Sequence, residues 1–362
     1  MRALGRFVGA ALLLVGLAGP AWADPLPKLA IDADHVTVSG ISSGAYMANQ
    51  FHVAHSARVD GAGLVAGGLY GCAVSTVIND KVMATASRAL AHCMRQSVFL
   101  ESADRFVGIA RQLERAGAID ALAGLRGDRV YLFTGEADTV VGAKVVRTAA
   151  EALGTLGVTT TLVSSLQGTP GAGAKAGHAF LTPDRGNAAC SDEKSPFFNA
   201  CRYDQAEAIL KVLYGPSLAP PAPALSGRLL RFDQSAYVRG GKAIKASLWD
   251  EGLVYVPADC ATGAACRLHI AFHGCKQSDQ VLGPAEKFWD LAGYNSWADT
   301  NHIVVLYPQA RAIGATEGFP LTAINPEGCW NWWGYGLDGK FLGREGLQIS
   351  AVNAMINALA GR

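Results

Sequence analysis

One short stretch of the chain carries the residue pattern of a catalytic nucleophile. Ser42 stands between Gly40 and Gly44 in HVTVSGISSGAYMANQF (35–51), where an alternating apolar run gives way to a helix-like one. A Gly-x-Ser-x-Gly pattern between a strand and a helix is typical of a nucleophile elbow, whose glycines allow a sharp turn that exposes the serine hydroxyl. The alternative is an ordinary turn in which Ser42 or Ser43 caps a helix.

A nucleophilic serine needs a base and an acid that orients the base, and in α/β-hydrolases these follow in the order Ser, Asp, His. Asp138 follows the apolar run RVYLFTG (129–135), with Glu136 as a close competitor. His178 lies in the glycine-rich stretch GTPGAGAKAGHAF (168–180), after the next apolar run. We therefore predict Ser42 as nucleophile, Asp138 as acid and His178 as base.

The elements that must position these residues alternate along the chain. Apolar runs predict strands near 36–39, 64–67, 129–135 and 158–166, and then near 229–232, 252–257, 267–274 and 302–308. Helices are predicted over 45–55, in a helical region at 82–123, and over 143–156, 204–213 and 347–359. Continuous apolar strands that alternate with helices indicate a parallel sheet covered on both faces.

A proline-rich stretch, GPSLAPPAPALSG (215–227), divides the chain. The plain interpretation is a boundary between two domains. An α/β-hydrolase, however, forms several strands before its elbow, together with an HG-type loop that donates an N–H to the oxyanion hole. Here the missing strands and the loop FHGCKQS (272–278) follow the linker. We predict a single circularly permuted α/β-hydrolase domain over 24–362, with a mostly parallel sheet and helices on both faces.

The first 23 residues have the features of a secretory signal peptide. Arg2 and Arg6 precede an apolar run, and Ala-Trp-Ala ends at Ala23. A membrane anchor is the alternative, but the apolar run is short. Without the two arginines the chain carries 29 basic and 30 acidic side chains, and so it lacks the basic surface of nucleic-acid-binding proteins. We expect a periplasmic or secreted protein that binds neither nucleic acid nor, after cleavage, a membrane.

All eight cysteines follow the predicted signal. An even number in an exported chain indicates disulfides, although eight cysteines allow many pairings. Zinc is the alternative, but no spacing is Cys-x-x-Cys and no histidine pair stands nearby at ligand spacing, so we expect neither a metal nor an organic cofactor. Pairing between neighbours along the chain is the simplest arrangement: Cys72 with Cys93, Cys190 with Cys201, Cys260 with Cys266, and Cys275 with Cys329.

Several stretches together resemble exported poly(3-hydroxybutyrate) depolymerases with a permuted, single catalytic domain. They are SGISSGAYMANQ (39–50), the Asp138 loop, GHAF (177–180), CSDEKSPFFNACRYDQAEAILKVLYG (190–215), HGCKQS (273–278), VVLYPQA (304–310) and GCWNWWGY (328–335). The resemblance covers nearly all of the mature chain. It implies a serine esterase of this polyester or its oligomers, with oxyanion donors at the backbone N–H groups of Ser43 and Cys275 and a disulfide holding the second donor's loop.

Many secreted relatives add a threonine-rich or fibronectin-like linker and a polymer-adsorbing domain, which this sequence lacks up to Arg362. The resemblance therefore favours amorphous granules or soluble oligomers as substrate. A feruloyl or acetyl-xylan esterase on the same scaffold is an alternative that the triad does not separate. A non-catalytic polymer-binding protein is a second alternative.

The stretch CWNWWGY (329–335) is unusually rich in aromatic residues. A polyester chain has no charge to bind, and so burial of apolar surface must supply most of its affinity. We predict Trp330, Trp332, Trp333 and His273 as substrate-binding side chains. The alternative is that these rings pack in the core, because tryptophan is highly buried on average.

Overall fold

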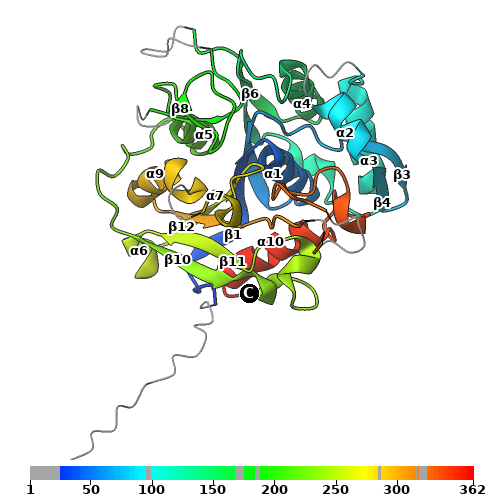
Figure 1. The fold of residues 1–362 in the computed structure, drawn as a ribbon. Helices are drawn as coiled ribbons and strands as arrows, with labels where there is room; N and C mark the ends of the chain where they lie inside the picture. Colours follow the sequence, from blue (N-terminus) through cyan, green and yellow to red (C-terminus); the bar gives the residue numbers. More distant parts are fainter. Residues whose placement is uncertain are drawn as a thin grey trace, which may run out of the picture.

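The structure is a computed structural model that describes residues 25–94, 99–167, 175–183, 188–283, 287–314, 316–317 and 324–362. The expected signal peptide lies outside these residues. A central sheet is flanked by helices (Figure 1). No helix in the described parts of the chain is long and apolar enough to cross a bilayer.

The central sheet has eight strands in the order β10, β11, β13, β12, β1, β2, β5, β6. The pairings from β13 to β6 are parallel, whereas β11 runs antiparallel to both β10 and β13. Its strands are β1 (Ile31–Ile41), β2 (Val59–Val65), β5 (Arg129–Phe133), β6 (Thr159–Val163), β10 (Arg228–Asp233), β11 (Glu251–Val256), β12 (Cys266–Phe272) and β13 (Ile303–Tyr307).

Strands from both sides of the proline-rich linker share this sheet. β1 pairs with β12 in parallel, from Ile31 beside Cys266 to Gly40 beside Phe272. Counted from the linker and continued through the start of the chain, β10 to β13 come first, and β1 is the fifth strand, with Ser42 just after its end. The chain therefore has a circularly permuted α/β-hydrolase fold, as the sequence predicted.

Helices bury both faces of the sheet because successive strand residues point in opposite directions. Val130 and Leu132 of β5 belong to the core on one face, whereas Tyr131 and Phe133 belong to the core on the other. The first core includes α1 (Ser43–Ala54), α2 (Ala86–Cys93), α3 (Ala103–Arg115), α4 (Ala143–Thr155) and α10 (Leu347–Leu359). The second includes α5 (Gln205–Tyr214), α8 (Phe288–Leu291) and α9 (Tyr294–Thr300).

The region predicted as helical over 82–123 begins differently. β3 (Val74–Ile78) and β4 (Lys81–Ala84) form an antiparallel hairpin before α2 and α3. The hairpin turns at Asn79, whose φ of 54° suits a tight turn, and β-branched residues follow one another in β3. Smaller elements were also not predicted: the sheet of β7 (Phe180–Thr182), β8 (Ala188–Ala189) and β9 (Phe198–Ala200), helices α6 (Ala258–Ala261) and α7 (Asp279–Leu282), and 3-10 turns at Leu122–Leu125, Gln234–Tyr237, Ala243–Ala246 and Tyr335–Leu337.

The start of the described chain lies against its end. The Leu29 N–H donates to the Leu359 carbonyl at 2.7 Å, and Arg362 forms an ion pair with Asp34 at 2.7 Å. The linker follows α5 in the chain and lies against α9, where the Ala222 N–H donates to the Ser296 carbonyl at 2.8 Å. In a circularly permuted fold, the present ends of the chain lie where an unpermuted chain would be continuous, and so they are expected to lie close together.

The four disulfides join neighbouring cysteines along the chain: Cys72 with Cys93, Cys190 with Cys201, Cys260 with Cys266, and Cys275 with Cys329. No cysteine is left free. Each bridge lies wholly on one side of the linker. Such a framework suits an oxidising compartment outside the cytosol.

Candidate active site

Ser42 occupies a sharp turn between β1 and α1. Its backbone has φ 54° and ψ −120°, a conformation that non-glycine residues rarely adopt, and its N–H donates to the Val65 carbonyl at 2.8 Å. At the two flanking positions only glycine fits, because a side chain there would collide with nearby backbone atoms. A Cβ on Gly40 would lie 2.3 Å from the carbonyl carbon of Gly44, and a Cβ on Gly44 would lie 2.3 Å from the Phe272 carbonyl oxygen. The strained serine is held by close backbone packing, as in a nucleophile elbow.

Asp138 and His178 meet beside this turn. The Asp138 Oδ2 lies 2.9 Å from the His178 Nδ1, and the Asp138 side chain is fully buried. Its other oxygen accepts the N–H groups of Val140 and Val141, each at 2.9 Å. The carboxylate is therefore fixed at both oxygens, and it orients the imidazole with Nε2 free for proton transfer. Glu136, the competing acid, is exposed.

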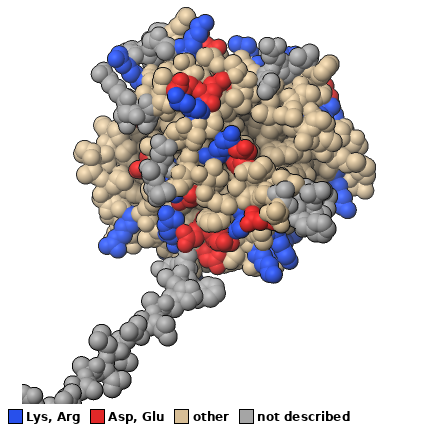
Figure 2. Space-filling view, in the orientation of Figure 1, with Lys and Arg blue, Asp and Glu red and all other residues tan. Residues whose placement is uncertain are grey.

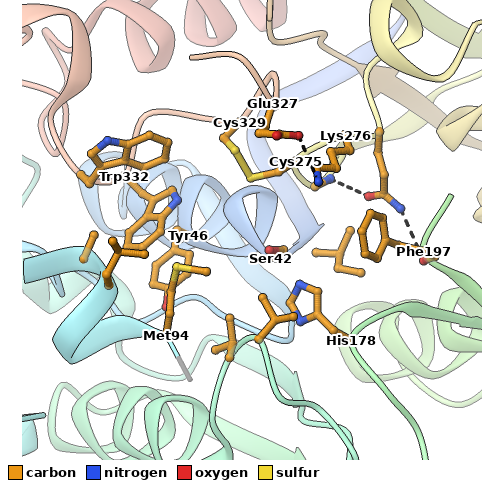
Figure 3. A pocket seen from close by; sticks show the side chains of 18 of the residues that line it. Ser42, Tyr46, Met94, His178, Phe197, Cys275, Lys276, Glu327, Cys329 and Trp332 are labelled. Atoms are coloured by element: carbon orange, nitrogen blue, oxygen red, sulfur yellow. Dashed lines mark hydrogen bonds and ion pairs between the residues drawn. A yellow bond between two sulfur atoms is a disulfide. The ribbon is translucent and has the colours of Figure 1, made fainter. Parts of the chain in front are cut away.

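Ser42 and His178 line one cleft of about 480 Å³. Figure 3 shows the serine side chain and the His178 ring facing each other at its floor. No hydrogen bond joins Ser42 to His178 in the structure, and such catalytic contacts often tighten only when substrate binds. The fold thus brings together Ser42, Asp138 and His178, which are far apart in the sequence.

The loop after β12 approaches the serine from the other side. The Gly274 N–H donates to the Gln277 side-chain oxygen at 2.7 Å, and the Gln277 amide donates to the Pro196 carbonyl at 2.8 Å. The Cys275–Cys329 disulfide anchors the same loop. Among the described residues, the backbone N–H groups of Ser43 and Cys275 have no acceptor, which leaves both free to bind an oxyanion.

The walls of the cleft are mainly apolar and aromatic. Tyr46, one turn after Ser42, stacks on Trp332 with ring centroids 4.2 Å apart, and Trp332 meets Trp333 edge to face at 5.2 Å. The other apolar lining residues are Ile41, Ala86, Ala89, Leu90, Met94, Val140, Val141 and Phe197. Sequence reasoning missed Tyr46, although its position four residues after the nucleophile, on the first turn of the expected helix, was a usable signal.

Two residues predicted to bind substrate do not reach the cleft. Trp330 and His273 are both fully buried. The Trp330 indole N–H donates to the His273 carbonyl at 3.0 Å, and the His273 Nε2 accepts the Ala310 N–H at 3.0 Å. Burial lowers the pKa of His273 to about 4, so its ring is neutral near pH 7. We correct the prediction: these side chains pack behind the loop that follows β12, because Trp330 is buried whereas Trp332 and Trp333 line the cleft.

A second serine–histidine contact lies inside the sheet. The Ser39 Oγ is 2.7 Å from the His269 Nε2, whose Nδ1 is 2.7 Å from the Thr37 Oγ1. Ser39 also contacts the Tyr294 hydroxyl at 2.7 Å. Ser39 and His269 are both fully buried, and no carboxylate takes part among the described residues. This cluster is a hydrogen-bonded part of the core.

One group of side chains has the spacing of a metal site, Asp259, Cys266 and His302. The Cys266 sulfur is bonded to Cys260, so it is not a thiolate and cannot serve as a ligand in this form. Asp259 and His302 contact each other at the surface instead.

The chain matches no family model. It is similar to the poly(3-hydroxybutyrate) depolymerase of Delftia acidovorans, at 35% identity over 97% of this chain, and it spans 65% of that relative's length. It is also similar to the polyhydroxybutyrate depolymerase of Talaromyces funiculosus, at 34% identity over 93% of both chains.

Two solved structures share the fold, each at 31% identity with a TM-score of 0.75, covering 93% of this chain and 99% of theirs. One is the crystal structure of a PHB depolymerase from Penicillium funiculosum. The other is a PHB depolymerase carrying a serine-to-alanine substitution, in complex with an R3HB trimer. With this similarity over most of its length, and with an elbow serine on a permuted α/β-hydrolase sheet, the chain belongs to the family of poly(3-hydroxybutyrate) depolymerases, which are carboxylic ester hydrolases.

Proposed function

We propose that this chain hydrolyses poly(3-hydroxybutyrate) or its oligomers with Ser42 as nucleophile, His178 as general base and Asp138 as the acid that orients it. One observation carries the proposal: His178, which a hydrogen bond of 2.9 Å joins to the buried Asp138 side chain, lines the same cleft as a strained elbow serine. A serine hydroxyl is a weak nucleophile unless an adjacent base removes its proton.

The reaction is an acyl transfer in two halves. His178 takes the Ser42 proton as Oγ attacks the ester carbonyl, and then gives that proton to the departing alcohol. Asp138 holds the imidazole tautomer and stabilises the imidazolium without taking the proton. Water, activated by His178, next cleaves the acyl-serine and releases a 3-hydroxyacid or a short oligomer. Each step uses groups that already line the cleft or support it.

The tetrahedral intermediate needs donors for its negative oxygen. The N–H groups of Ser43 and Cys275, which have no acceptor among the described residues, supply the proposed oxyanion hole. The loss of one such donor typically costs about 3 kcal/mol of barrier height. The Gln277 bridge to the Pro196 carbonyl and the Cys275–Cys329 disulfide hold the second donor in place before substrate arrives, so little reorganisation is needed during the reaction.

The apolar cleft fits a methyl-bearing polyester better than a sugar. Tyr46, Trp332, Trp333, Phe197 and Leu90 present rings and alkyl groups to the substrate, whereas a carbohydrate would call for many hydrogen-bonding groups. A structural neighbour is described in complex with an R3HB trimer, which supports the same substrate class here. The signal-like N-terminus and the four disulfides support export to the periplasm or the medium.

A panel assay tests the proposal. Purified enzyme is incubated with amorphous poly(3-hydroxybutyrate), crystalline polymer, soluble hydroxybutyrate oligomers, feruloyl esters and acetylated xylan, and the released acids are quantified. We expect hydrolysis of oligomers and amorphous polymer, together with covalent labelling of Ser42 by a fluorophosphonate probe. Release of ferulate or acetate alone would assign the chain to carbohydrate esterases, and a protein that the probe does not label would be a binding module.

A further inference from the structure

The cleft that holds Ser42 contains one cationic side chain among its described lining residues, Lys276. Two carboxylates share the lining, Glu193 and Glu327. Glu193 is already engaged, because its oxygens accept the N–H and hydroxyl of Thr139 at 2.6 and 2.5 Å. Lys276 is therefore the one cationic side chain of the described lining that can attract a negatively charged substrate end.

The backbone places Lys276 beside the proposed oxyanion donor. It follows Cys275 directly, its φ is 63°, and its N–H donates to the Glu327 carbonyl at 2.7 Å. The Cys275–Cys329 disulfide and the Gln277 contacts fix the residues on either side. The left-handed conformation of a non-glycine residue costs free energy, and such strain is found mainly at ligand sites. Here the residue in this conformation is a lysine that lines the cleft.

The charge of Lys276 is available to a ligand. Its Nζ lies 3.3 Å from the Glu327 Oε2, at the rim of the cleft in Figure 3, and both side chains are 47% exposed. Exposed ion pairs of this kind contribute little to stability. A second carboxylate can therefore replace Glu327 as the partner of Lys276 at small cost. On the face shown in Figure 2, most of the surface is uncharged, and the charged side chains lie in groups that contain both signs.

The proposed substrate has one negative group, at one end. An oligomer of 3-hydroxybutyrate carries a hydroxyl at one terminus, a carboxylate at the other and neutral esters between them. When Ser42 attacks an ester carbonyl, the acyl part that stays on the serine contains the hydroxyl terminus. The alcohol that leaves contains the carboxylate terminus. Any group that recognises the carboxylate therefore acts on the leaving-group side.

We propose that Lys276 binds the terminal carboxylate of a short hydroxyacid oligomer and so selects free oligomer ends over the interior of a polymer chain. This inference rests on the esterase function proposed above and names the specificity of the same cleft. The distance from the lysine to the serine then sets how many units lie between the cleaved ester and the acid end. Free-acid oligomers are cut at a constant distance from that end.

The test compares the trimer of 3-hydroxybutyrate as the free acid with its methyl ester, which has the same number of units but no charge. Removal of one charge-assisted hydrogen bond at a partly exposed site corresponds to about a tenfold change in KM. We expect the wild-type enzyme to have a higher kcat/KM on the free acid than on the methyl ester. Lys276→Met should lower the ratio of these two kcat/KM values about tenfold. Lys276→Arg should leave the ratio unchanged. Glu327→Gln removes the competing carboxylate and should raise the ratio. Added salt should lower the ratio in the wild type.

A matched control uses Lys194→Met, which removes an exposed lysine paired with Asp192 at 2.9 Å outside the cleft lining and should leave the ratio unchanged. A wild-type ratio near one, or an equal loss on both substrates in Lys276→Met, would overturn the role of Lys276 while leaving the esterase function standing. Failure of the wild type to hydrolyse either compound would reject the proposed function itself.

Discussion

The molecule has two serine–histidine pairs whose serines, Ser39 and Ser42, stand close together in the chain. Ser42 and His178 line a cleft, and Asp138 holds the imidazole. Ser39 and His269 are hydrogen-bonded directly, at 2.7 Å, yet both are fully buried and share hydroxyl partners only. A short serine–histidine distance is therefore a poor guide to chemistry.

The difference lies in access, charge and strain. Burial lowers the pKa of His269 to about 3, which makes this ring a much weaker base than an ordinary imidazole and poorly suited to take a proton from a hydroxyl near pH 7. Ser39 lies within a regular strand, whereas Ser42 is held at φ 54° on a turn. A working pair needs a carboxylate behind the histidine and open space before the serine.

The largest effect is expected at the nucleophile. Ser42→Ala should lower kcat by roughly 10⁶-fold, because no other group forms the acyl-enzyme. Esterase assays and fluorophosphonate labelling measure this loss, and the melting temperature should stay near wild type. Ser43→Ala is the matched control and should be mild, since its proposed role is through the backbone. If Ser43→Ala were inactive and Ser42→Ala active, the elbow assignment would be wrong.

The next largest effect is expected at Asp138, the carboxylate that holds His178 and has no counterpart beside His269 among the described residues. Asp138→Asn should reduce kcat by about 10⁴-fold, because an amide donor in place of Oδ2 favours the wrong imidazole tautomer. Steady-state kinetics and circular dichroism separate this loss from misfolding. Glu136→Gln, at the exposed competing acid, serves as the control and should retain wild-type kcat. If Glu136→Gln lost most of its kcat and Asp138→Asn lost little, Glu136 would be the acid in place of Asp138.

The buried histidines should control stability in acid. Burial lowers the pKa values of His269, His273 and His55 to about 3, 4 and 4, against roughly 6.5 in an unfolded chain. Unfolding therefore takes up protons below pH 6.5, and the free energy of unfolding should fall as pH drops from about 6.5 towards 4, by up to about 1.4 kcal/mol per pH unit for each ring. Urea denaturation at pH 7.5, 5.5 and 4.5 measures the slope. A free energy that stays constant across this range would contradict the lowered pKa values of these rings.

A smaller loss is expected from the buried serine. Ser39→Ala leaves the His269 Nε2 and the Tyr294 hydroxyl without a partner and should lower the free energy of unfolding by about 1–3 kcal/mol. Its kcat should remain close to wild type, because Ser39 does not reach the cleft. Thermal and urea unfolding are compared with kinetics on one preparation. If Ser39→Ala were as stable as wild type but inactive, the Ser39–His269 cluster would take part in the reaction.

The smallest effect on hydrolysis is expected at the tryptophans that line the cleft. Trp333→Ala should raise KM for oligomers by about tenfold, with little change for a short p-nitrophenyl ester, because it removes apolar surface from the cleft. Trp332→Ala should act in the same direction. Trp330→Ala should instead lower the melting temperature strongly, since this ring is fully buried. Equal losses on both substrates for all three variants, with large falls in melting temperature, would assign the whole stretch to the core.

The sequence was sufficient for the features that depend on local pattern and chain order. The Gly40–Gly44 motif, the order Ser42, Asp138, His178 and the position of the linker predicted the elbow, the acid–base contact and the permuted sheet. Helix α10 was predicted at its observed bounds because its apolar residues run without a breaker. Such features follow from turn chemistry and apolar runs.

Features that depend on tertiary packing could not be predicted in this way. The helical region predicted over 82–123 overlaps strand β4 of the hairpin, because a short apolar run alone does not separate a helix from a strand. The inward direction of Trp330 and the outward direction of Trp333 follow from the disulfide and the oxyanion loop, because the sequence alone does not state which ring faces which side. The cleft position of Phe197 depends on the Gln277 contact, across 80 residues of chain.

The placement of the four disulfides has a consequence for taking the molecule apart. Because no bridge crosses the linker at 215–227, one cut there would leave two fragments joined only by the shared sheet and core, with β1 of one fragment paired to β12 of the other. One fragment would carry Ser42, Asp138 and His178, and the other would carry the Cys275 loop. We expect the two fragments, produced separately and mixed, to form a split enzyme in which ester hydrolysis reports their association.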